Sequence, residues 1–149
     1  MALLPDATGS ESDHELTQKF LDALPHARAL GIQLVGMGPG MMEIAMPWSA
    51  DFVGDPSTGV LHGGVVSALM DTCCGGAVMV HPTRPNSTAT SDLRIEYLRS
   101  ATPGQRLRAR AECFHITRSV AFVRAIARDD DDDNPVATAT GSFTVEGAR

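Results

Sequence analysis

Hydrophobic and polar residues alternate with two different periods along the chain, and the change of period separates predicted helices from predicted strands. Leu16, Phe20 and Leu24 are spaced four residues apart, which predicts an amphipathic helix over residues 12–24. Six later segments follow a strand-like pattern, and they are residues 31–38, 42–48, 92–98, 105–115, 119–128 and 136–145. The chain is therefore expected to combine a short N-terminal helix with about six strands.

Residues 60–80 are apolar on nearly every side and form the longest predicted helix. A helix without a polar face has to be covered by other elements, and a curved antiparallel sheet of about six strands would cover it. Turn residues at positions 38–40, 103–104 and 117–119 predict that successive strands are antiparallel neighbours, as in a meander. The predicted fold class is α+β, with the sheet wrapped around one central helix. Apolar surface left open by a single sheet predicts at least a dimer.

The length of 149 residues predicts one domain, which we place at residues 11–149 after a flexible tail of residues 1–10. The N-terminus shows no basic leader followed by an apolar stretch, so no signal peptide is expected. The charge-free stretch of residues 56–70 is too short to cross a bilayer. We therefore expect a cytoplasmic protein that does not contact membranes.

The net charge of −6 arises almost entirely from the acidic run at residues 129–133, which is predicted to be the exposed turn of the last hairpin. The remainder of the chain is close to neutral and lacks the basic surface that nucleic acid requires. The acidic run also lacks the glycine and the spacing of a calcium loop. The three cysteines show no metal-binding spacing, and Cys73 and Cys74 are interpreted as small core residues. We expect neither metal nor cofactor.

The segment GVLHGGVVSALMD at residues 59–71 carries the clearest chemical signal. Gly63 and Gly64 fall where a loop becomes a helix, so backbone N–H groups there lack intrahelical partners and suit an oxyanion formed on a carbonyl group. Asp71 lies inside the apolar helix, where an unpaired carboxylate is unfavourable. The alternatives are structural. The glycines would allow close packing, His62 would have a structural role, and Asp71 would form a hydrogen bond with the region of Thr72 or with a neighbouring strand.

The spacing within this segment constrains how its two ends could cooperate. The nine residues from His62 to Asp71 correspond to about 13.5 Å of helical rise, so both ends cannot contact one carbonyl group within one chain. If Gly63 and Asp71 act together, antiparallel helices from two subunits must lie side by side. A catalytic site of this kind would require a homodimer.

The motif LHGGVVSALMD, followed by a strand that begins TSDLRIEYLRSATPG, resembles the hotdog-fold thioesterases of the phenylacetate-pathway (PaaI) type over about residues 20–145. The resemblance implies a hotdog fold, homodimers that pair into homotetramers, and hydrolysis of acyl-CoA thioesters without metal. It also implies that the Gly63 amide polarises the thioester carbonyl and that Asp71 activates water or attacks directly. Thr90 would help to place the water, and His62 completes the set of candidate catalytic residues.

One position departs from the family pattern, because relatives commonly carry an Asn about six residues before the His, where this chain has Pro56 beside Asp55. Candidate substrate-binding residues are Gly64, Asp55 and Pro56. Candidate partners for the phosphates of CoA are Arg94, Arg99, Arg118 and Arg124. A short aliphatic or an aryl acyl group could be bound by Phe52, Val53, Met70, Cys74 and Met79.

Two other functions fit the same predicted fold. A non-catalytic module that binds or senses acyl-CoA would keep the pocket and would not need Asp71. A hotdog-fold hydratase would need a His and carboxylate pair acting on the acyl chain, and the sequence offers no compact Asp-x-x-x-x-His arrangement. Release of thiol from a thioester distinguishes an enzyme from a binding module.

Overall fold

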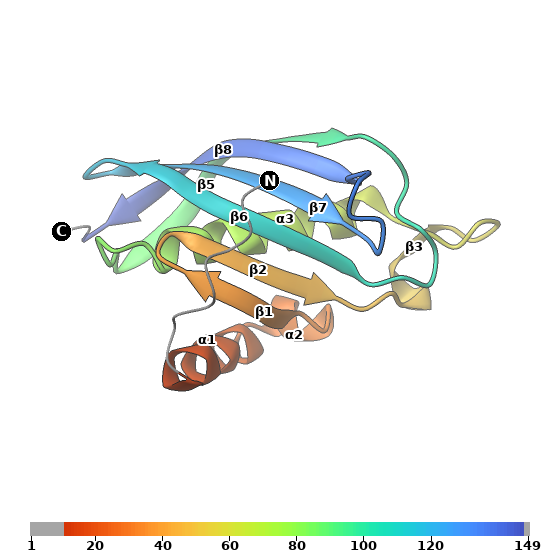
Figure 1. Ribbon diagram of the computed structural model, residues 1–149, viewed down its shortest axis with the longest axis horizontal. Helices are drawn as coiled ribbons and strands as arrows, with labels where there is room; N and C mark the ends of the chain where they lie inside the picture. The colour runs from red at the N-terminus through yellow and green to blue at the C-terminus, as the bar shows by residue number, and fades with distance from the viewer. Residues whose placement is uncertain (1–10, 148–149) are drawn as a thin grey trace.

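The computed structural model describes residues 11–147, so the predicted tail of residues 1–10 lies outside the described residues (Figure 1). Its elements are α1 (Glu11–Ala23), α2 (Pro25–Ala29), β1 (Gln33–Gly38), β2 (Met41–Met46), a 3-10 turn (Ala50–Phe52), β3 (Val53–Asp55), β4 (Val60–Leu61), α3 (Gly63–Met79), β5 (Ser87–Tyr97), β6 (Leu107–Ile116), β7 (Val120–Arg128) and β8 (Ala137–Glu146). Both predicted helices and all six predicted strands are present. The sequence pattern missed α2, because Pro25 begins a second short helix after the first one ends.

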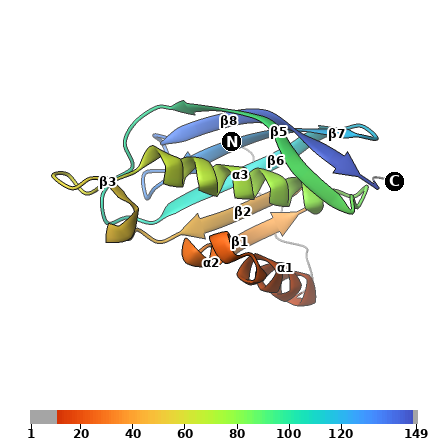
Figure 2. The ribbon, with the colours of Figure 1, turned by 180° about the vertical axis from the view of Figure 1, so that it is seen from behind.

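Six antiparallel strands form one sheet in the order β1-β2-β6-β7-β8-β5, and β3 pairs with β4 in a small separate sheet. The long helix α3 lies across one face of the large sheet, and α1 and α2 lie beside β1 (Figure 2). This arrangement confirms the predicted fold class, an α+β hotdog fold with one central helix and a short N-terminal helix. None of the described helices is long and apolar enough to cross a membrane.

Small residues on the sheet allow α3 to pack closely against it. The alternation predicted for β6 is confirmed, since Leu107, Ala109 and Ala111 are buried while the arginines between them are partly exposed. Leu69 and Cys73 are among the fully buried residues that α3 contributes to the same core. A sheet face rich in alanine thus leaves the space that a helix with larger side chains fills.

The prediction that α3 is buried on every side is wrong for the single chain. Val66, Leu69 and Cys73 are buried on the side that faces the sheet, whereas Asp71 and Gly75 are half-exposed. The physical reason is that one sheet layer can cover only one side of a helix. The apolar composition of the half-exposed side is what the second layer of a dimer would cover.

The prediction that successive strands are antiparallel neighbours is correct for the β1–β2 hairpin and for β6, β7 and β8, but not for β5 and β6. β5 pairs with β8 at the far edge of the sheet, so residues 98–106 cross past the ends of two strands instead of forming a tight turn. The crossing spans three strand spacings, or about 14 Å, which nine residues cover easily. Pro103 and Gly104 do form a turn, but it lies within this crossover.

The crossover is held by a carboxylate that the sequence analysis placed in an exposed turn. Asp129 is fully buried, and its side chain accepts five hydrogen bonds, two from Arg99, two from Thr102 and one from the Asp131 backbone N–H. The bonds from the Arg99 guanidinium, both 2.7 Å long, lower the pKa of Asp129 well below its usual value. The predicted β7–β8 hairpin is confirmed and residues 130–133 are exposed, but Asp129 belongs to the folded interior.

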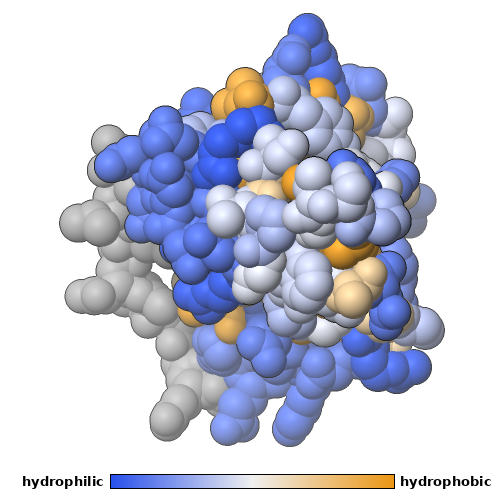
Figure 3. Space-filling model, turned by 90° about the vertical axis from the view of Figure 1, so that its right-hand side faces the viewer, coloured by the Kyte–Doolittle hydropathy of each residue, from blue (hydrophilic) through white to orange (hydrophobic). Residues whose placement is uncertain are grey.

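The end of the molecule at the right of Figure 1 is largely hydrophilic. Figure 3 looks at this end and shows hydrophobic side chains only as small patches among hydrophilic ones. The β3–β4 hairpin projects from the same end, and its base is held by the hydrogen bond from the Trp48 indole N–H to the Gly59 carbonyl oxygen. The larger apolar recess of the molecule lies elsewhere, beside α3.

Candidate active site

In the first turn of α3 the backbone N–H groups of Gly64 and Val65 are hydrogen-bonded to His62, and that of Gly63 is available. His62 is the N-cap residue, and its Nδ1 accepts a 2.8 Å hydrogen bond from the Gly64 N–H. Because Nδ1 accepts, this bond assigns the ring proton of a neutral imidazole to Nε2. Within the described part of the chain, no acceptor is found for the Gly63 N–H. His62 therefore orients the first turn and leaves the Gly63 N–H for a ligand.

Two contacts that the sequence analysis did not identify fix this turn from outside. The Tyr97 hydroxyl at the end of β5 donates a 3.0 Å hydrogen bond to the Gly63 carbonyl oxygen. Gly54 lies against His62 so closely that a Cβ atom there would come within 2.8 Å of the His62 Cα. Gly54 is the first residue of the segment GDPSTG at residues 54–59. A glycine at this position is the sequence signal for the close approach. The helix start is thus held by a strand and a loop that flank it.

Asp71 meets Thr90 on the half-exposed side of α3. The Thr90 hydroxyl donates a 2.7 Å hydrogen bond to Asp71 Oδ1, so the structure brings together two residues predicted to be catalytic that are 19 positions apart. The neighbouring hydroxyl of Thr72 donates instead to the Ala68 carbonyl oxygen within the helix. A carboxylate has about four acceptor positions, so Asp71 keeps capacity to accept a proton from a bound water.

A β-bulge next to Thr90 shapes the strand at this point. Thr90 and Asp92 pair with successive residues Phe143 and Ser142 of β8, which leaves Ser91 as the extra residue. A Cβ atom at Gly141 of β8 would come within 2.2 Å of the Asp92 carbonyl oxygen, so only glycine fits opposite the bulge. An isolated glycine inside a strand is a recognised signal for this feature, and it could have located the bulge from the sequence.

Asp71 and Thr90 lie at the edge of a cavity of about 670 Å³. The cavity is lined by the half-exposed face of α3, by Asn86 and residues 87–90 of β5, and by α1, and its lining is mainly apolar. This volume is in the range of pockets that bind small molecules. A carboxylate with a hydroxyl partner beside an apolar pocket is suited to activating water next to a bound hydrophobic group.

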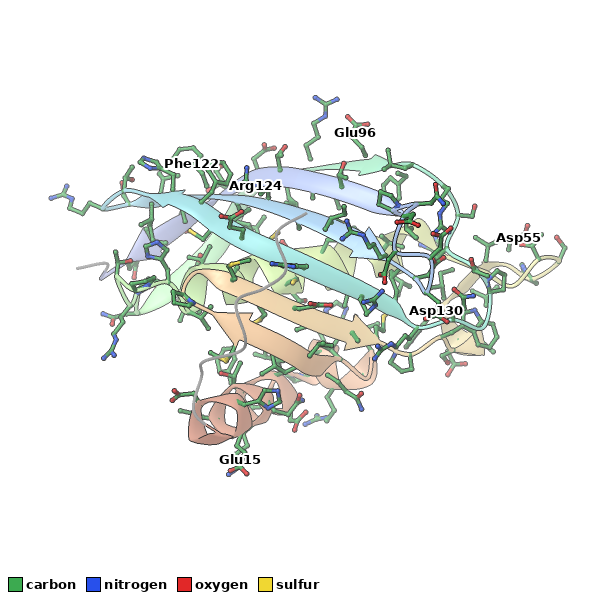
Figure 4. All side chains as sticks on the ribbon, viewed as in Figure 1. Glu15, Asp55, Glu96, Phe122, Arg124 and Asp130 are labelled. Carbon is green, nitrogen blue, oxygen red and sulfur yellow. The ribbon has the colours of Figure 1, made fainter. Side chains whose placement is uncertain are left out.

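The structure keeps several predicted site residues apart. Gly63 and Asp71 are eight residues apart on one helix, a rise of about 12 Å, so one chain does not bring them to a common point. Asp55 lies in the projecting β3–β4 hairpin (Figure 4), and Pro56 follows it in the turn. The Asp55 carboxylate accepts hydrogen bonds from Ser57 and Thr58, which lower its pKa.

The arginines proposed to bind phosphate lie at scattered positions. Arg94 is exposed on β5 and pairs with Glu96, and Arg118 is exposed in the turn between β6 and β7. Arg99 pairs with Asp129. Arg124 pairs with Glu112 and lies over the Phe114 ring, on the sheet surface where Figure 4 labels it with Phe122. No single basic cluster results from these positions.

Most of the residues predicted to bind the acyl group do not line this cavity. Met79 lines the cavity, but Met70 and Cys74 are fully buried in the core, and Phe52 and Val53 lie near the opposite end of α3. Cys73 is also fully buried, which confirms that both adjacent cysteines are core residues. Burial raises the pKa of Cys74 to about 12, with a smaller contribution from the charge of Asp71. Between residues 11 and 147, no cluster of three or more His, Cys, Asp or Glu side chains could hold a metal ion.

Comparisons with known proteins agree with this fold and this arrangement. The chain matches the Thioesterase superfamily over residues 58–136, which include the start of α3, Asp71 and Thr90. It is 28% identical to the medium/long-chain acyl-CoA thioesterase YigI of Salmonella typhimurium, over 86% of this chain and 90% of that protein. A crystal structure from Pseudomonas aeruginosa is 34% identical, with a TM-score of 0.77 over 88% of this chain and 97% of that one.

A mutant of the phenylacetic acid degradation protein PaaI from Thermus thermophilus is also similar. Its structure is 27% identical in sequence and superposes with a TM-score of 0.71 over 81% of this chain and 98% of that one. Fold, motif and comparisons together define a hotdog thioester hydrolase of the PaaI type. The chain belongs to the thioesterase superfamily.

Proposed function

We propose that this protein hydrolyses acyl-CoA thioesters to a free acid and CoA. The observation that supports this most directly is the Asp71–Thr90 hydrogen bond at the edge of the apolar cavity beside α3. The similar YigI protein of Salmonella carries the name medium/long-chain acyl-CoA thioesterase, and the similarity spans 86% of this chain. A thioester also suits a site without a strong general acid, because a thiolate with a pKa near 8.5 is a good leaving group.

In the proposed reaction, Asp71 accepts a proton from a water molecule held beside it and beside Thr90. The resulting hydroxide adds to the thioester carbonyl carbon, and the negative oxygen accepts a hydrogen bond from the Gly63 N–H. The carbon–sulfur bond then breaks and CoA leaves as the thiolate, while the proton on Asp71 is released. Hydrolysis in H₂¹⁸O under single-turnover conditions tests this role, because a carboxylate that attacks directly would take the label into the protein.

We further propose that Asp71 and the Gly63 N–H of one site come from different subunits of a homodimer. Three features support this: the rise of about 12 Å between the two residues, the half-exposed side of α3, and the free edge of β5. β5 is eleven residues long and lies at the end of the strand order, so its outer edge is available for pairing. Pairing of two such dimers into a homotetramer, and a cytoplasmic location, remain predictions.

Two roles in substrate binding are also proposed. Gly64 holds the turn through His62, so we assign it to shaping the site. Asp55 and Pro56 on the projecting hairpin, with Arg94 and Arg118, are assigned to contacts with the CoA part of the substrate. The hairpin can reach a neighbouring subunit because it extends beyond the sheet (Figure 4).

The proposed activity is tested by measuring thiol release from acetyl-, hexanoyl-, palmitoyl-, phenylacetyl- and hydroxybenzoyl-CoA. Turnover of at least one thioester by the wild-type protein is expected. Binding of these thioesters without thiol release would instead favour a non-catalytic binding module.

The two-subunit site is tested by mixing two inactive variants, Asp71→Asn and Gly63→Pro. Proline is well suited to the first helical position, the extended His62 backbone (ψ 136°) accepts a following proline, and the change removes the N–H. Gly63→Ala keeps the N–H and is the matched control, since its Cβ would lie 3.6 Å from the Tyr97 ring. Mixed dimers that contain one intact site should regain activity, whereas a site within one chain predicts no recovery.

A further inference from the structure

The cavity beside Asp71 is lined mainly by side chains of α1 and α3 and by residues 86–90, with Met42 of β2 and Phe143 of β8. On α3 the lining residues Asp71, Gly75 and Met79 recur every four positions, so they form a straight line along one face. Leu16 and Phe20 of α1, and Leu24 just after its last residue, recur with the same spacing, although they remain 69%, 55% and 38% exposed. The stripe on α3 therefore has a carboxylate at one end, a residue without a side chain in the middle and a thioether at the other end.

Gly75 and Gly76 are adjacent in α3, but packing within the chain requires a glycine at only one of these positions. A Cβ atom at Gly76 would lie 2.2 Å from the Met42 sulfur, so close packing against β2 explains this glycine. At Gly75 the nearest atom, Cε1 of Phe143, would be 3.6 Å away, which is an ordinary contact. Glycine destabilises the middle of a helix relative to alanine. Packing within the chain therefore does not account for Gly75, whose missing side chain leaves the middle of the cavity open.

We propose that Gly75 keeps open a channel for the acyl chain of the substrate, and that Leu16 and Phe20 of α1 form its outer wall. The proposal rests on the proposed thioesterase activity and specifies its substrate class. The acyl carbonyl lies at Asp71, and the chain runs along α3 toward Met79. Exposed apolar side chains on α1 thereby gain an apolar partner, and the polar atoms of Asp71 and Thr90 stay at the reacting end.

The helix provides a scale for chain length. Asp71 and Gly75 are separated by about 6 Å of rise, and Asp71 and Met79 by about 12 Å. An extended hydrocarbon chain advances about 1.25 Å per carbon, given C–C bonds of about 1.5 Å. Four to five carbons therefore reach Gly75, and nine to ten reach Met79. The channel is matched to acyl groups of about ten carbons.

The experiment compares kcat/KM for even-numbered acyl-CoAs from two to sixteen carbons in wild type, Gly75→Ala and Gly75→Leu. We expect Gly75→Leu to retain turnover of acetyl- and butyryl-CoA and to lose about 10-fold to 200-fold with decanoyl-CoA, the range for misfit in a hydrophobic pocket. The kcat/KM of Gly75→Ala for decanoyl-CoA should lie between the values of wild type and Gly75→Leu. This variant should also melt at a higher temperature than wild type. Ala68→Leu adds bulk to α3 outside the cavity and should leave the chain-length profile unchanged.

The competing explanation is that a second copy of α3 packs against Gly75, and the subunit state of each variant tests it. Uniform loss of activity at every chain length together with dissociation of the Gly75→Leu dimer would overturn the acyl-channel proposal. An unchanged length profile in a stable dimer would overturn it as well. If the wild type hydrolyses no thioester, the proposed function fails by itself. Calorimetric binding of decanoyl-CoA to wild type and Gly75→Leu then tests the channel alone, and equal affinities would reject it.

The wall formed by α1 is tested by Phe20→Ala with Phe114→Ala as its matched control. Both side chains are about half exposed, but Phe114 lies on β6 outside the cavity. Phe20→Ala should lower kcat/KM for decanoyl-CoA by about 10-fold, in the range of hydrophobic pocket contacts, and leave acetyl-CoA turnover unchanged. Phe114→Ala should change neither value. Equal effects of the two substitutions would show that α1 does not contact the acyl chain.

Discussion

The two carboxylates Asp129 and Asp71 occupy opposite kinds of environment in one small protein. Asp129 is fully buried, and all of its hydrogen bonds come from the protein itself. Asp71 is half-exposed at the edge of a cavity and accepts one hydrogen bond, from Thr90. The number of partners thus separates a carboxylate that holds the fold from one that is available to a substrate.

This difference follows from what each carboxylate has to satisfy. A buried charge requires full compensation, and Arg99 with the backbone of residues 102 and 131 provides it at the crossover. A catalytic base must instead keep an acceptor position for a proton that arrives during the reaction. Substitution of Asp129 is therefore expected to lower stability with little effect on turnover. Substitution of Asp71 is expected to lower turnover with little effect on stability.

The largest effect is expected from Asp71→Asn, which removes the proposed base while preserving the shape of the side chain. The kcat for the best thioester should fall by about 10²-fold to 10⁴-fold, the usual contribution of general base catalysis. The melting temperature should stay close to that of the wild type. Thiol release and thermal unfolding are measured on the same preparations. Near-normal turnover with unchanged melting would exclude Asp71 as the base.

The next largest effect is expected from Asp129→Asn, which leaves Arg99 without its charged partner. The free energy of unfolding should fall by about 3–5 kcal/mol, as for other buried ion pairs that lose one member. Asp130→Asn, at an exposed position of the same turn (Figure 4), is the control and should change it by less than about 0.5 kcal/mol. Denaturant titration gives both values. Equal effects at the two positions would contradict a structural role for Asp129.

Acid should weaken the wild type through the same ion pair. The pKa of Asp129 in the folded state is lower than its usual value, so its stabilising contribution is complete above about pH 4–5, the upper end of the range where an unfolded Asp titrates. The contribution is lost as the pH falls toward the folded pKa. Unfolding measured at pH 5, 4 and 3 should therefore show a steeper loss of stability in wild type than in Asp129→Asn. Parallel pH curves would count against this coupling.

The smallest effect is expected from Thr90→Val, which removes the hydroxyl bonded to Asp71 and keeps a side chain of similar shape. A hydrogen bond to a charged group contributes about 1.5 kcal/mol at the lower end of its range, so kcat should fall by about 10-fold. Thr140→Val, at an exposed position on β8, is the control and should leave kcat unchanged. A loss as large as that of Asp71→Asn would instead show that the Thr90 hydroxyl takes part in the proton transfer.

Local patterns in the sequence were sufficient to predict most elements and the two ends of the candidate site. The start of α3 at Gly63 follows from the glycine pair after His62, and Asp71 was conspicuous in an apolar helix. Thr90 was identified only through the family resemblance, because its contact with Asp71 depends on where β5 lies. Residue spacing reports on neighbours along the chain, and this contact joins two separate elements.

The edge position of β5 and the burial of Asp129 could not be predicted for the same reason. The turn residues at 103–104 suggested a hairpin, yet the nine-residue connection was long enough to cross two strands. Charge repulsion in the acidic run suggested exposure of all its members, and Asp129 is the one that finds Arg99. The cavity could not be predicted either, because it forms mainly between α1, α3 and β5, which are distant in the sequence.

The strand order also determines when the fold can be completed during synthesis. β5 leaves the ribosome before β6, β7 and β8, but its partner in the sheet is β8, with Ser87 paired to Glu146. β5 therefore has no strand to pair with until almost the entire chain has been made, and this long-range pairing is of the kind that slows folding. A nascent chain stalled before β8 exposes two unpaired strand edges, which makes the last ten-residue strand the element that protects the protein from aggregation.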